Sequence, residues 1–306
     1  MDFRSIGSLR VSVVGLGCNN FGMRIDEGAT TRVVDAALDA GINFFDTADI
    51  YGSTKSEEFL GRALAGRRQQ AIVATKFGMA VDEQRKGARP EYVRRAAEDS
   101  LKRLRTDYID LYQLHQPDPA VPIADTLGAL NDLVTAGKVK EIGCSNFSAD
   151  QLDEAARATK RGAATFVSVQ NEYSVLHREP EPSVLPACQR LGLAFLPYFP
   201  LASGLLTGKY VPGKGAPRDS RLSLSWTSRF TSDRNVRIAE ALKAFASSHG
   251  HSLLELAVSW LASRPQVASV IAGATSPEQV RANAAAVNWP LTPQDLTNID
   301  QRATLV

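Results

Sequence analysis

Cysteine is scarce in this sequence of 306 residues: only Cys18, Cys144 and Cys188 occur, and no two of them form a C-x-x-C pair. The sequence therefore predicts neither a disulfide framework nor a thiolate zinc site, and a reducing compartment is expected. His249 and His251 form a lone H-x-H pair without a suitably spaced carboxylate or cysteine, which is more typical of surface histidines than of metal ligands. We therefore expect no metal.

Long apolar runs and an excess of one charge are missing as well. The first 17 residues are interrupted by Asp2, Arg4 and Arg10, so they lack the continuous apolar core of a signal peptide. No apolar run approaches the roughly 20 residues that span a bilayer. The charges nearly cancel, with 35 Lys and Arg against 33 Asp and Glu, a net charge of +2. These features predict a cytoplasmic protein with neither a membrane nor a nucleic acid as its partner.

What the sequence does contain is an alternation of short β-rich runs with amphipathic helical segments along nearly its whole length. Strands are expected at residues 11–17, 42–46, 71–76, 108–115, 139–144, 166–170, 193–198 and 267–271. The first helix is expected to be capped by Thr30. Further helices are expected at 56–65, 90–104, 123–136, 148–160, 183–191, 236–248, 253–262 and 276–286.

Eight strands separated by helices, with no linker-like break in composition, predict an α/β fold, a (β/α)8 TIM barrel that spans residues 1–306 as a single domain. Residues 3–11 contain Gly7 and Ser8 and are expected to form a β-hairpin that precedes the barrel. Residues 203–233 are rich in Gly, Pro and Ser and too long for a routine connection. This long loop of the C-terminal face is a candidate lid.

In a β/α barrel the active site lies at the carboxyl ends of the strands, where the predicted strand ends bring together Asp46, Tyr51, Lys76 and His115. A free tyrosine has a pKa of about 10, a nearby ammonium lowers this value, and a carboxylate beside the lysine keeps the ammonium charged. Histidine adds a donor that can orient a carbonyl oxygen. The set indicates proton donation to a carbonyl that is being reduced, rather than acyl transfer, because no G-x-S-x-G elbow is present.

Residues 41–52 (GINFFDTADIYG) resemble the signature of the aldo-keto reductases. Further matching segments are 75–77 (TKF), 143–147 (GCSNF), 170–173 (QNEY), 198–201 (YFPL), 204–210 (GLLTGKY) and 273–279 (GATSPEQ), so the similarity covers residues 3 to 288. The resemblance implies an NADP(H)-dependent carbonyl reductase. In it, Tyr51 acts as the general acid, Lys76 and Asp46 tune that acid, and His115 orients the substrate carbonyl.

The resemblance also implies a cofactor site and a substrate site. The implied cofactor-binding residues are Gly17, Cys18, Asp46, Ser145, Asn146, Gln170, Tyr198, Phe199, Pro200, Leu201, Ala202, Ser203, Gly204, Lys209, Arg221, Gly273, Thr275, Gln279 and Asn283. Ser145, Asn146 and Gln170 match positions that hold the nicotinamide carboxamide, and Tyr198 matches the aromatic residue that stacks on the ring. Tyr51, His115, Asn20 and Trp226 are the candidate substrate contacts.

This sequence departs from the family pattern at three cofactor positions. Ala282 replaces a frequent glutamate, Gln279 replaces an arginine that often meets the 2′-phosphate, and Phe199 replaces a small polar residue. Because Arg221 and Lys209 can still meet a 2′-phosphate, NADP(H) is expected as the preferred cofactor and NAD(H) is the alternative.

Two other functions stay open at this point. One is a nicotinamide-binding redox sensor with little turnover, similar to the potassium-channel β-subunit branch of the family. The other, against which the cofactor set argues, is a lyase or isomerase on the same barrel. The sequence does not identify the carbonyl substrate or the physiological direction, and it does not decide between a monomer and a homo-oligomer.

Overall fold

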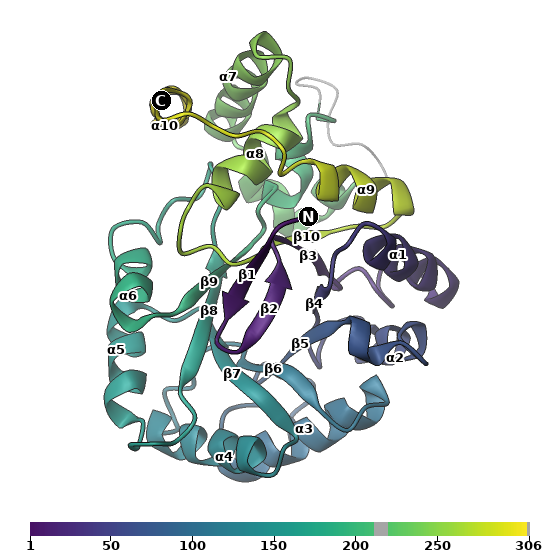
Figure 1. Cartoon of the computed structure of the whole chain (residues 1–306), viewed down its shortest axis with the longest axis vertical. Helices are drawn as coiled ribbons and strands as arrows, with labels where there is room; N and C mark the ends of the chain where they lie inside the picture. The colour runs from purple at the N-terminus through teal and green to yellow at the C-terminus, as the bar shows by residue number, and fades with distance from the viewer. Residues whose placement is uncertain (211–219, 305–306) are drawn as a thin grey trace.

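The computed structural model describes residues 1–210 and 220–304, apart from the side chains of residues 225 and 226. Eight parallel strands stand side by side in the order β10-β3-β4-β5-β6-β7-β8-β9. The ring closes next to β9, where Phe195 N donates to Gln266 O (2.7 Å) and Ala268 N donates to Phe195 O (3.0 Å). Helices surround this ring (Figure 1). The predicted (β/α)8 barrel is confirmed.

The elements of the barrel alternate along the chain. The strands are β3 (Val14–Gly17), β4 (Phe44–Asp46), β5 (Ile72–Phe77), β6 (Ile109–Leu114), β7 (Val139–Ser145), β8 (Phe166–Glu172), β9 (Ala194–Tyr198) and β10 (Val270–Gly273). The helices are α1 (Glu27–Asp39), α2 (Lys55–Ala63), α3 (Pro90–Leu104), α4 (Ile123–Thr135), α5 (Ala149–Ala158), α6 (Val184–Leu191), α7 (Asp233–Ser248), α8 (Leu253–Ala262), α9 (Pro277–Ala285) and α10 (Pro293–Thr304).

The predicted hairpin precedes the barrel as the antiparallel strands β1 (Phe3–Ile6) and β2 (Leu9–Ser12), which lie across one end of the ring (Figure 1). The side chains of Ile6, Leu9 and Val11 are buried in one cluster with Phe44 and Leu111 from the barrel strands. The hairpin therefore covers the N-terminal end of the barrel with apolar contacts. The C-terminal ends of the strands are left for a binding site.

Several predicted boundaries are wrong. Residues 11–17 were predicted as one strand, but they belong to two, β2 and β3. Hydrophobic periodicity could not show the break, because both strands are buried parts of one apolar segment. Helix α1 is capped by Asp26, which accepts a hydrogen bond from Ala29 N (2.8 Å), and not by Thr30. The last barrel strand begins three residues later than predicted, at Val270, and α10 was not predicted at all. Short 3₁₀ helices at Ala202–Thr207, Arg221–Ser223 and Ser225–Thr231 occupy the candidate lid, whose residues 211–219 lie outside the described part.

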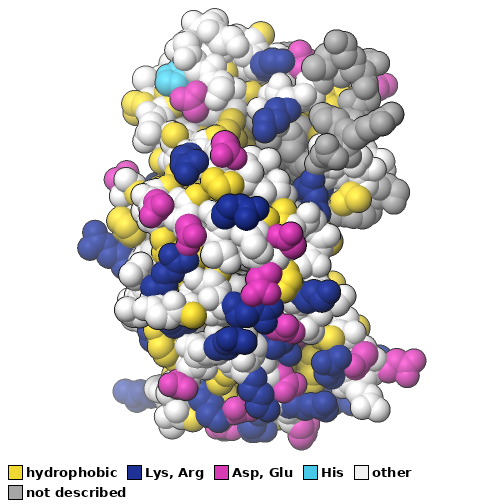
Figure 2. Space-filling model, turned by 90° about the vertical axis from the view of Figure 1, so that its right-hand side faces the viewer, with side chains coloured by type: hydrophobic (Ala, Val, Ile, Leu, Met, Phe, Trp, Pro, Cys, Tyr) yellow, Lys and Arg dark blue, Asp and Glu magenta, His cyan; other side chains and the backbone are white. Residues whose placement is uncertain are grey.

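The outer helices carry charges of both signs. On the face shown in Figure 2, Lys and Arg side chains are interspersed with Asp and Glu. Some of them pair between neighbouring helices, as Arg62 of α2 does with Glu27 of α1 (2.6 Å) and Arg94 of α3 with Asp132 of α4 (2.7 Å). Such exposed pairs add little stability. Among the described residues, no helix is long and apolar enough to cross a membrane.

Candidate active site

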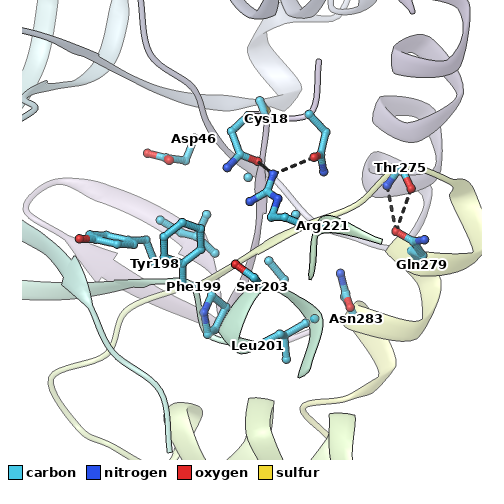
Figure 3. A pocket seen from close by; sticks show the side chains of 18 of the residues that line it. Cys18, Asp46, Tyr198, Phe199, Leu201, Ser203, Arg221, Thr275, Gln279 and Asn283 are labelled. Carbon is cyan, nitrogen blue, oxygen red and sulfur yellow. Dashed lines mark hydrogen bonds between the residues drawn. The ribbon is translucent and has the colours of Figure 1, made fainter. Parts of the chain in front are cut away.

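A cavity of about 1290 Å³ opens at the C-terminal ends of the strands (Figure 3). Its wall takes residues from the C-terminal parts of the barrel strands or from the segments that follow them, at all eight strands. All the sequence-predicted cofactor residues line it except Ala202, which is buried behind the wall. Tyr51, His115 and Asn20 also line the cavity, whereas the side chain of Trp226 lies outside the described residues. The structure therefore brings most of the predicted site together.

A buried ion pair lies at the base of the cavity. Lys76 Nζ donates to Asp46 Oδ2 (2.7 Å) and to the backbone oxygen of Thr47 (2.9 Å). The Lys76 side chain is 0% exposed and that of Asp46 is 5% exposed. Burial is the largest single influence and lowers the pKa of Lys76, but the Asp46 carboxylate and Tyr51 together outweigh it, so the pKa of Lys76 lies above its ordinary value. The ammonium is therefore charged at neutral pH.

Tyr51 lies against this pair, with Lys76 Nζ 5.1 Å from the centre of its ring. Burial raises the pKa of Tyr51 above its ordinary value, and the Lys76 ammonium only partly opposes this effect. The sequence expectation of a lowered pKa is therefore wrong, because it weighed the charge of Lys76 and not the loss of water. The Tyr51 hydroxyl is protonated at neutral pH, as a proton donor must be.

His115 follows β6, and its ring meets that of Tyr51 edge to face, with 5.8 Å between ring centres. Burial, assisted by the nearby Lys76 charge, lowers the pKa of His115 to about 3. The imidazole is therefore neutral at physiological pH. Its Nδ1 atom is buried without a hydrogen-bond partner. A buried N–H is rarely left unpaired, so the proton belongs on Nε2, and His115 can donate one hydrogen bond from that atom.

Polar side chains at the C-terminal ends of β7, β8 and β9 form a connected chain beside these groups, which is joined where Asn146 Nδ2 donates to Ser145 Oγ (3.2 Å). Tyr198 OH donates to Asn146 Oδ1 (2.7 Å), and Asn146 Nδ2 donates to the backbone oxygen of His115 (2.9 Å). Ser145 Oγ donates to Gln170 O (2.7 Å), and Gln170 Nε2 donates to Asp46 Oδ1 (2.9 Å). Asn146 has a positive φ of 61°, a conformation that Asn tolerates better than most residues. The chain fixes both the ring of Tyr198 and the carboxylate of Asp46.

The loop after β9 has an unusual backbone. Phe199, Ala202 and Ser203 have φ values of 51°, 45° and 56°, and Gly204 has a φ of 113°. Non-glycine residues rarely adopt this left-handed conformation, and strained residues of this kind cluster at ligand sites. Ser203 Oγ is buried and unpaired although the residue lines the cavity. This hydroxyl is a donor for an oxygen-rich ligand such as a pyrophosphate.

Arg221 reaches across the cavity to the end of β3, where its Nη2 donates to Asn19 Oδ1 and Asn20 Oδ1 (2.7 Å each; Figure 3). Burial, and to a lesser extent Arg24, lowers the pKa of Arg221 to about 10, so the guanidinium remains charged at neutral pH. The two side chains to which it donates are neutral amides. A partly buried cation of this kind favours an anionic ligand in the cavity.

The other end of the cavity is formed by the start of α9. Ser276 caps this helix, and Gln279 Oε1 accepts hydrogen bonds from Thr275 N (3.0 Å) and Thr275 Oγ1 (3.3 Å; Figure 3). Asn283 is buried one turn further along. The positive end of the α9 dipole favours a phosphate group here. The polar residues of the wall extend from the catalytic residues to the start of α9, and this extended arrangement fits a dinucleotide.

Sequence reasoning missed several residues of the wall. Ile50, Met79, Leu222 and Leu254 add apolar surface, and Arg24 adds a charge. Ile50 and Met79 follow predicted strand ends, so their position was a signal, but their apolar side chains carry no chemical motif. Within residues 1–210 and 220–304, no group of three or more His, Cys, Asp or Glu side chains could hold a metal ion.

The closed ring of strands, with a cavity at the carboxyl ends of the strands, places the protein in the TIM-barrel class. The model of the aldo/keto reductase family matches residues 13–303, and the chain belongs to this family. Nicotinamide cofactors are bound by this family in general.

The relatives agree with this assignment. The chain is 36% identical to a probable voltage-gated potassium channel β-subunit of Oryza sativa subsp. japonica, over 98% of this chain and 96% of that protein. It is 35% identical to an aldo-keto reductase of Bacillus subtilis (strain 168), over 98% and 93%. The solved glycerol dehydrogenase of Gluconobacter oxydans superimposes with a TM-score of 0.85 and 31% identity, over 98% of this chain and 94% of that one.

Proposed function

We propose that the protein uses NADPH to reduce an aldehyde or ketone to the alcohol, with Tyr51 as the general acid. The observation that carries the proposal is the contact of the Tyr51 ring with the Lys76 ammonium, 5.1 Å from its centre, above the buried Lys76–Asp46 pair (2.7 Å). A reduced nicotinamide supplies a hydride, which adds to the carbonyl carbon. The residues of this chain then have to place the carbonyl and deliver one proton to its oxygen.

Each residue has a definite task in this reaction. His115 is neutral and donates from Nε2 to the carbonyl oxygen, which orients the carbonyl toward the hydride donor. Tyr51 transfers its hydroxyl proton to the same oxygen as the alcohol forms. The Lys76 ammonium stabilises the phenolate that is left, and the Asp46 carboxylate keeps this ammonium charged and in place. The phenolate is reprotonated from water before the next turnover.

The cofactor preference is proposed on the charges of the wall. Lys209 and Arg221 line the cavity, and a 2′-phosphate requires cationic partners. Ser145, Asn146 and Gln170 would hold the carboxamide, and Tyr198 would stack on the ring. Ser203 Oγ, which is buried and unpaired, would donate to the pyrophosphate. A small carbonyl compound is the proposed substrate, and Asn20 together with the apolar residues Ile50 and Met79 would surround it.

The test is the consumption of NADPH and NADH at 340 nm with a panel of aldehydes, ketones and quinones, for the wild type and Tyr51→Phe. This substitution removes the proton donor and leaves the ring, so turnover should fall by at least about a hundredfold, the lower end of general acid catalysis. Cofactor affinity, measured by tryptophan fluorescence, should change little. Equal turnover in the two proteins would refute Tyr51 as the acid.

The second candidate is a cofactor-binding regulatory subunit with little turnover, and it is favoured by the name of the rice relative. The same experiment separates the two candidates. Tight NADPH binding without consumption over the whole panel would support the regulatory subunit. Turnover that depends on Tyr51 would support the reductase.

A further inference from the structure

Gln113 is a polar residue inside the barrel that belongs to no wall of the cavity. It lies on β6 directly opposite Lys76 of β5 and Gly143 of β7 in the parallel register. Its side chain is buried at 0% exposure, and it is not among the residues that line the cavity. Sequence reasoning did not select it, because it stands within the apolar run of a strand.

The amide of Gln113 points at the ion pair. Gln113 Nε2 donates to Asp46 Oδ1 (3.3 Å), the same oxygen that accepts from Gln170 Nε2 (2.9 Å), while Asp46 Oδ2 accepts from Lys76 (2.7 Å). Three side-chain donors, from three different strands, therefore converge on one carboxylate.

Gly143 makes room for this side chain. A Cβ atom at Gly143 would lie 3.3 Å from Gln113 Cγ and only 2.5 Å from Ser168 Oγ on the next strand. The gap in the ring of inward-facing side chains lets Gln113 lie across the barrel interior. The glycine on the neighbouring strand thus leaves room for Ser168 and for the stem of the Gln113 side chain.

The other half of the amide shows what determines its orientation. Gln113 Oε1 is buried without a hydrogen-bond partner, which is costly for stability. The reversed amide would be worse, because it would bring Oε1 against the Asp46 carboxylate and leave the NH2 group unpaired. The orientation is therefore set by Asp46.

We propose that Gln113 is a positioning residue of the reductase: its amide holds the Asp46 carboxylate in the orientation that keeps Oδ2 on the Lys76 ammonium beneath Tyr51. This inference rests on the proposed function. It adds a residue that touches neither substrate nor cofactor and acts through Asp46 alone.

The first test is Gln113→Met, which keeps the length of the side chain and removes the donor. One hydrogen bond to a charged group is lost, so kcat should fall about tenfold. The KM and the dissociation constant of NADPH should stay unchanged, because Gln113 does not line the cavity. The matched control is Ser168→Ala, which removes another buried and unpaired polar atom of the barrel interior. This control should keep the kcat of the wild type.

The second test is Gln113→Glu, a conservative variant. When protonated, the introduced carboxyl can donate an O–H bond to Asp46 Oδ1, so kcat should approach the wild-type value at acid pH. Three titratable groups face this carboxyl: Asp46 from β4, Lys76 from β5 and Tyr51 from the segment after β4. As the carboxyl ionises, it repels Asp46, competes with Asp46 for Lys76 and thereby disturbs Tyr51. The ratio of mutant to wild-type kcat should therefore fall steeply as the pH rises.

The outcomes separate this inference from the function on which it rests. If the wild type consumes no cofactor with any carbonyl substrate, both the proposed function and the inference about Gln113 are refuted. A wild type with Tyr51-dependent turnover leaves the function standing, and the inference is then overturned if Gln113→Met keeps full kcat. It is equally overturned if kcat and NADPH affinity fall together or if Gln113→Glu shows no change in its pH profile. Circular dichroism and thermal unfolding establish whether each variant is folded. If Gln113→Met does not fold, the pH profile of Gln113→Glu decides the question.

Discussion

Replacing Lys76 by methionine would leave the Asp46 carboxylate buried without its counter-ion. The Asp46 side chain is 5% exposed, and among the described side chains only the amides of Gln113 and Gln170 would still donate to it. Removing one partner of a buried ion pair destabilises a protein by about 3–5 kcal/mol. Because two donors remain, the lower end applies, about 3 kcal/mol. At about 2 °C per kcal/mol for a chain of this size, the melting temperature should fall by about 6 °C.

A second substitution should restore stability without restoring activity. In the double variant Lys76→Met with Asp46→Asn no charge is buried, and the new amide oxygen can still accept from Gln113 and Gln170. Neutral replacement of a buried pair is often close to isoenergetic, so the double variant should lie within about 1 kcal/mol of the wild type. It should reduce no carbonyl substrate, because the ammonium beside Tyr51 is gone.

Urea unfolding at pH 7 without cofactor measures these differences, and NADPH oxidation measures the activity. The control is Arg94→Met, which breaks the pair with Asp132 whose side chains are 47% and 59% exposed. Such an exposed pair should contribute at most about 1 kcal/mol. The reasoning is refuted if Lys76→Met is as stable as Arg94→Met, or if the double variant is no more stable than Lys76→Met.

Two further predictions concern the other charged groups. Burial, with a smaller contribution from Glu57, raises the pKa of Asp49 to about 7. The stability that this group supplies is therefore present below its unfolded pKa of about 3.9 and is lost as the pH rises through 7. The melting temperature of Asp49→Asn relative to wild type should rise between pH 5 and pH 8, and parallel curves would contradict this. Arg221→Met and Lys209→Met should each weaken NADPH binding about tenfold, the loss of one charge-assisted bond, and should weaken NADH binding less, because both cations are proposed to meet the 2′-phosphate; fluorescence titration with both cofactors tests these expectations.

Much of the fold was predictable because the hydrophobic pattern and the helix signals are local. Pro90 starts α3 as predicted, since its fixed φ suits the first helical turn. The pattern was insufficient where contacts between distant residues decide the structure. Helix α10 buries only Ile299 and Ala303, too few residues to give a clear amphipathic period. The candidate lid is held by Arg221, whose partners Asn19 and Asn20 lie about 200 positions earlier in the chain.

The candidate site was predictable to a similar extent. The rule that polar residues at strand ends meet at one mouth was sufficient to bring Asp46, Tyr51 and His115 together. The rule did not identify Gln113, because this residue lies one layer below the mouth and is linked to the site through its hydrogen bond to Asp46. It also gave the wrong direction for the pKa of Tyr51, since burial is a property of the folded chain and not of a motif.

The Asp110 carboxylate and the polar groups near the C-terminal mouth are satisfied to different degrees. At the N-terminal end, Asp110 accepts from Arg68 (2.6 Å), from Val73 N (3.0 Å) and from Lys140 (2.8 Å), so both of its oxygens are paired. At or just below the C-terminal mouth, Gln113 Oε1, His115 Nδ1 and Ser203 Oγ are buried and unpaired. Unpaired buried groups reduce stability and persist where binding or catalysis uses their neighbours or partners. Removing the Ser203 hydroxyl, which has no partner to lose, should therefore stabilise the fold at the expense of cofactor binding, whereas changes around Asp110 would lose stability and leave the site intact.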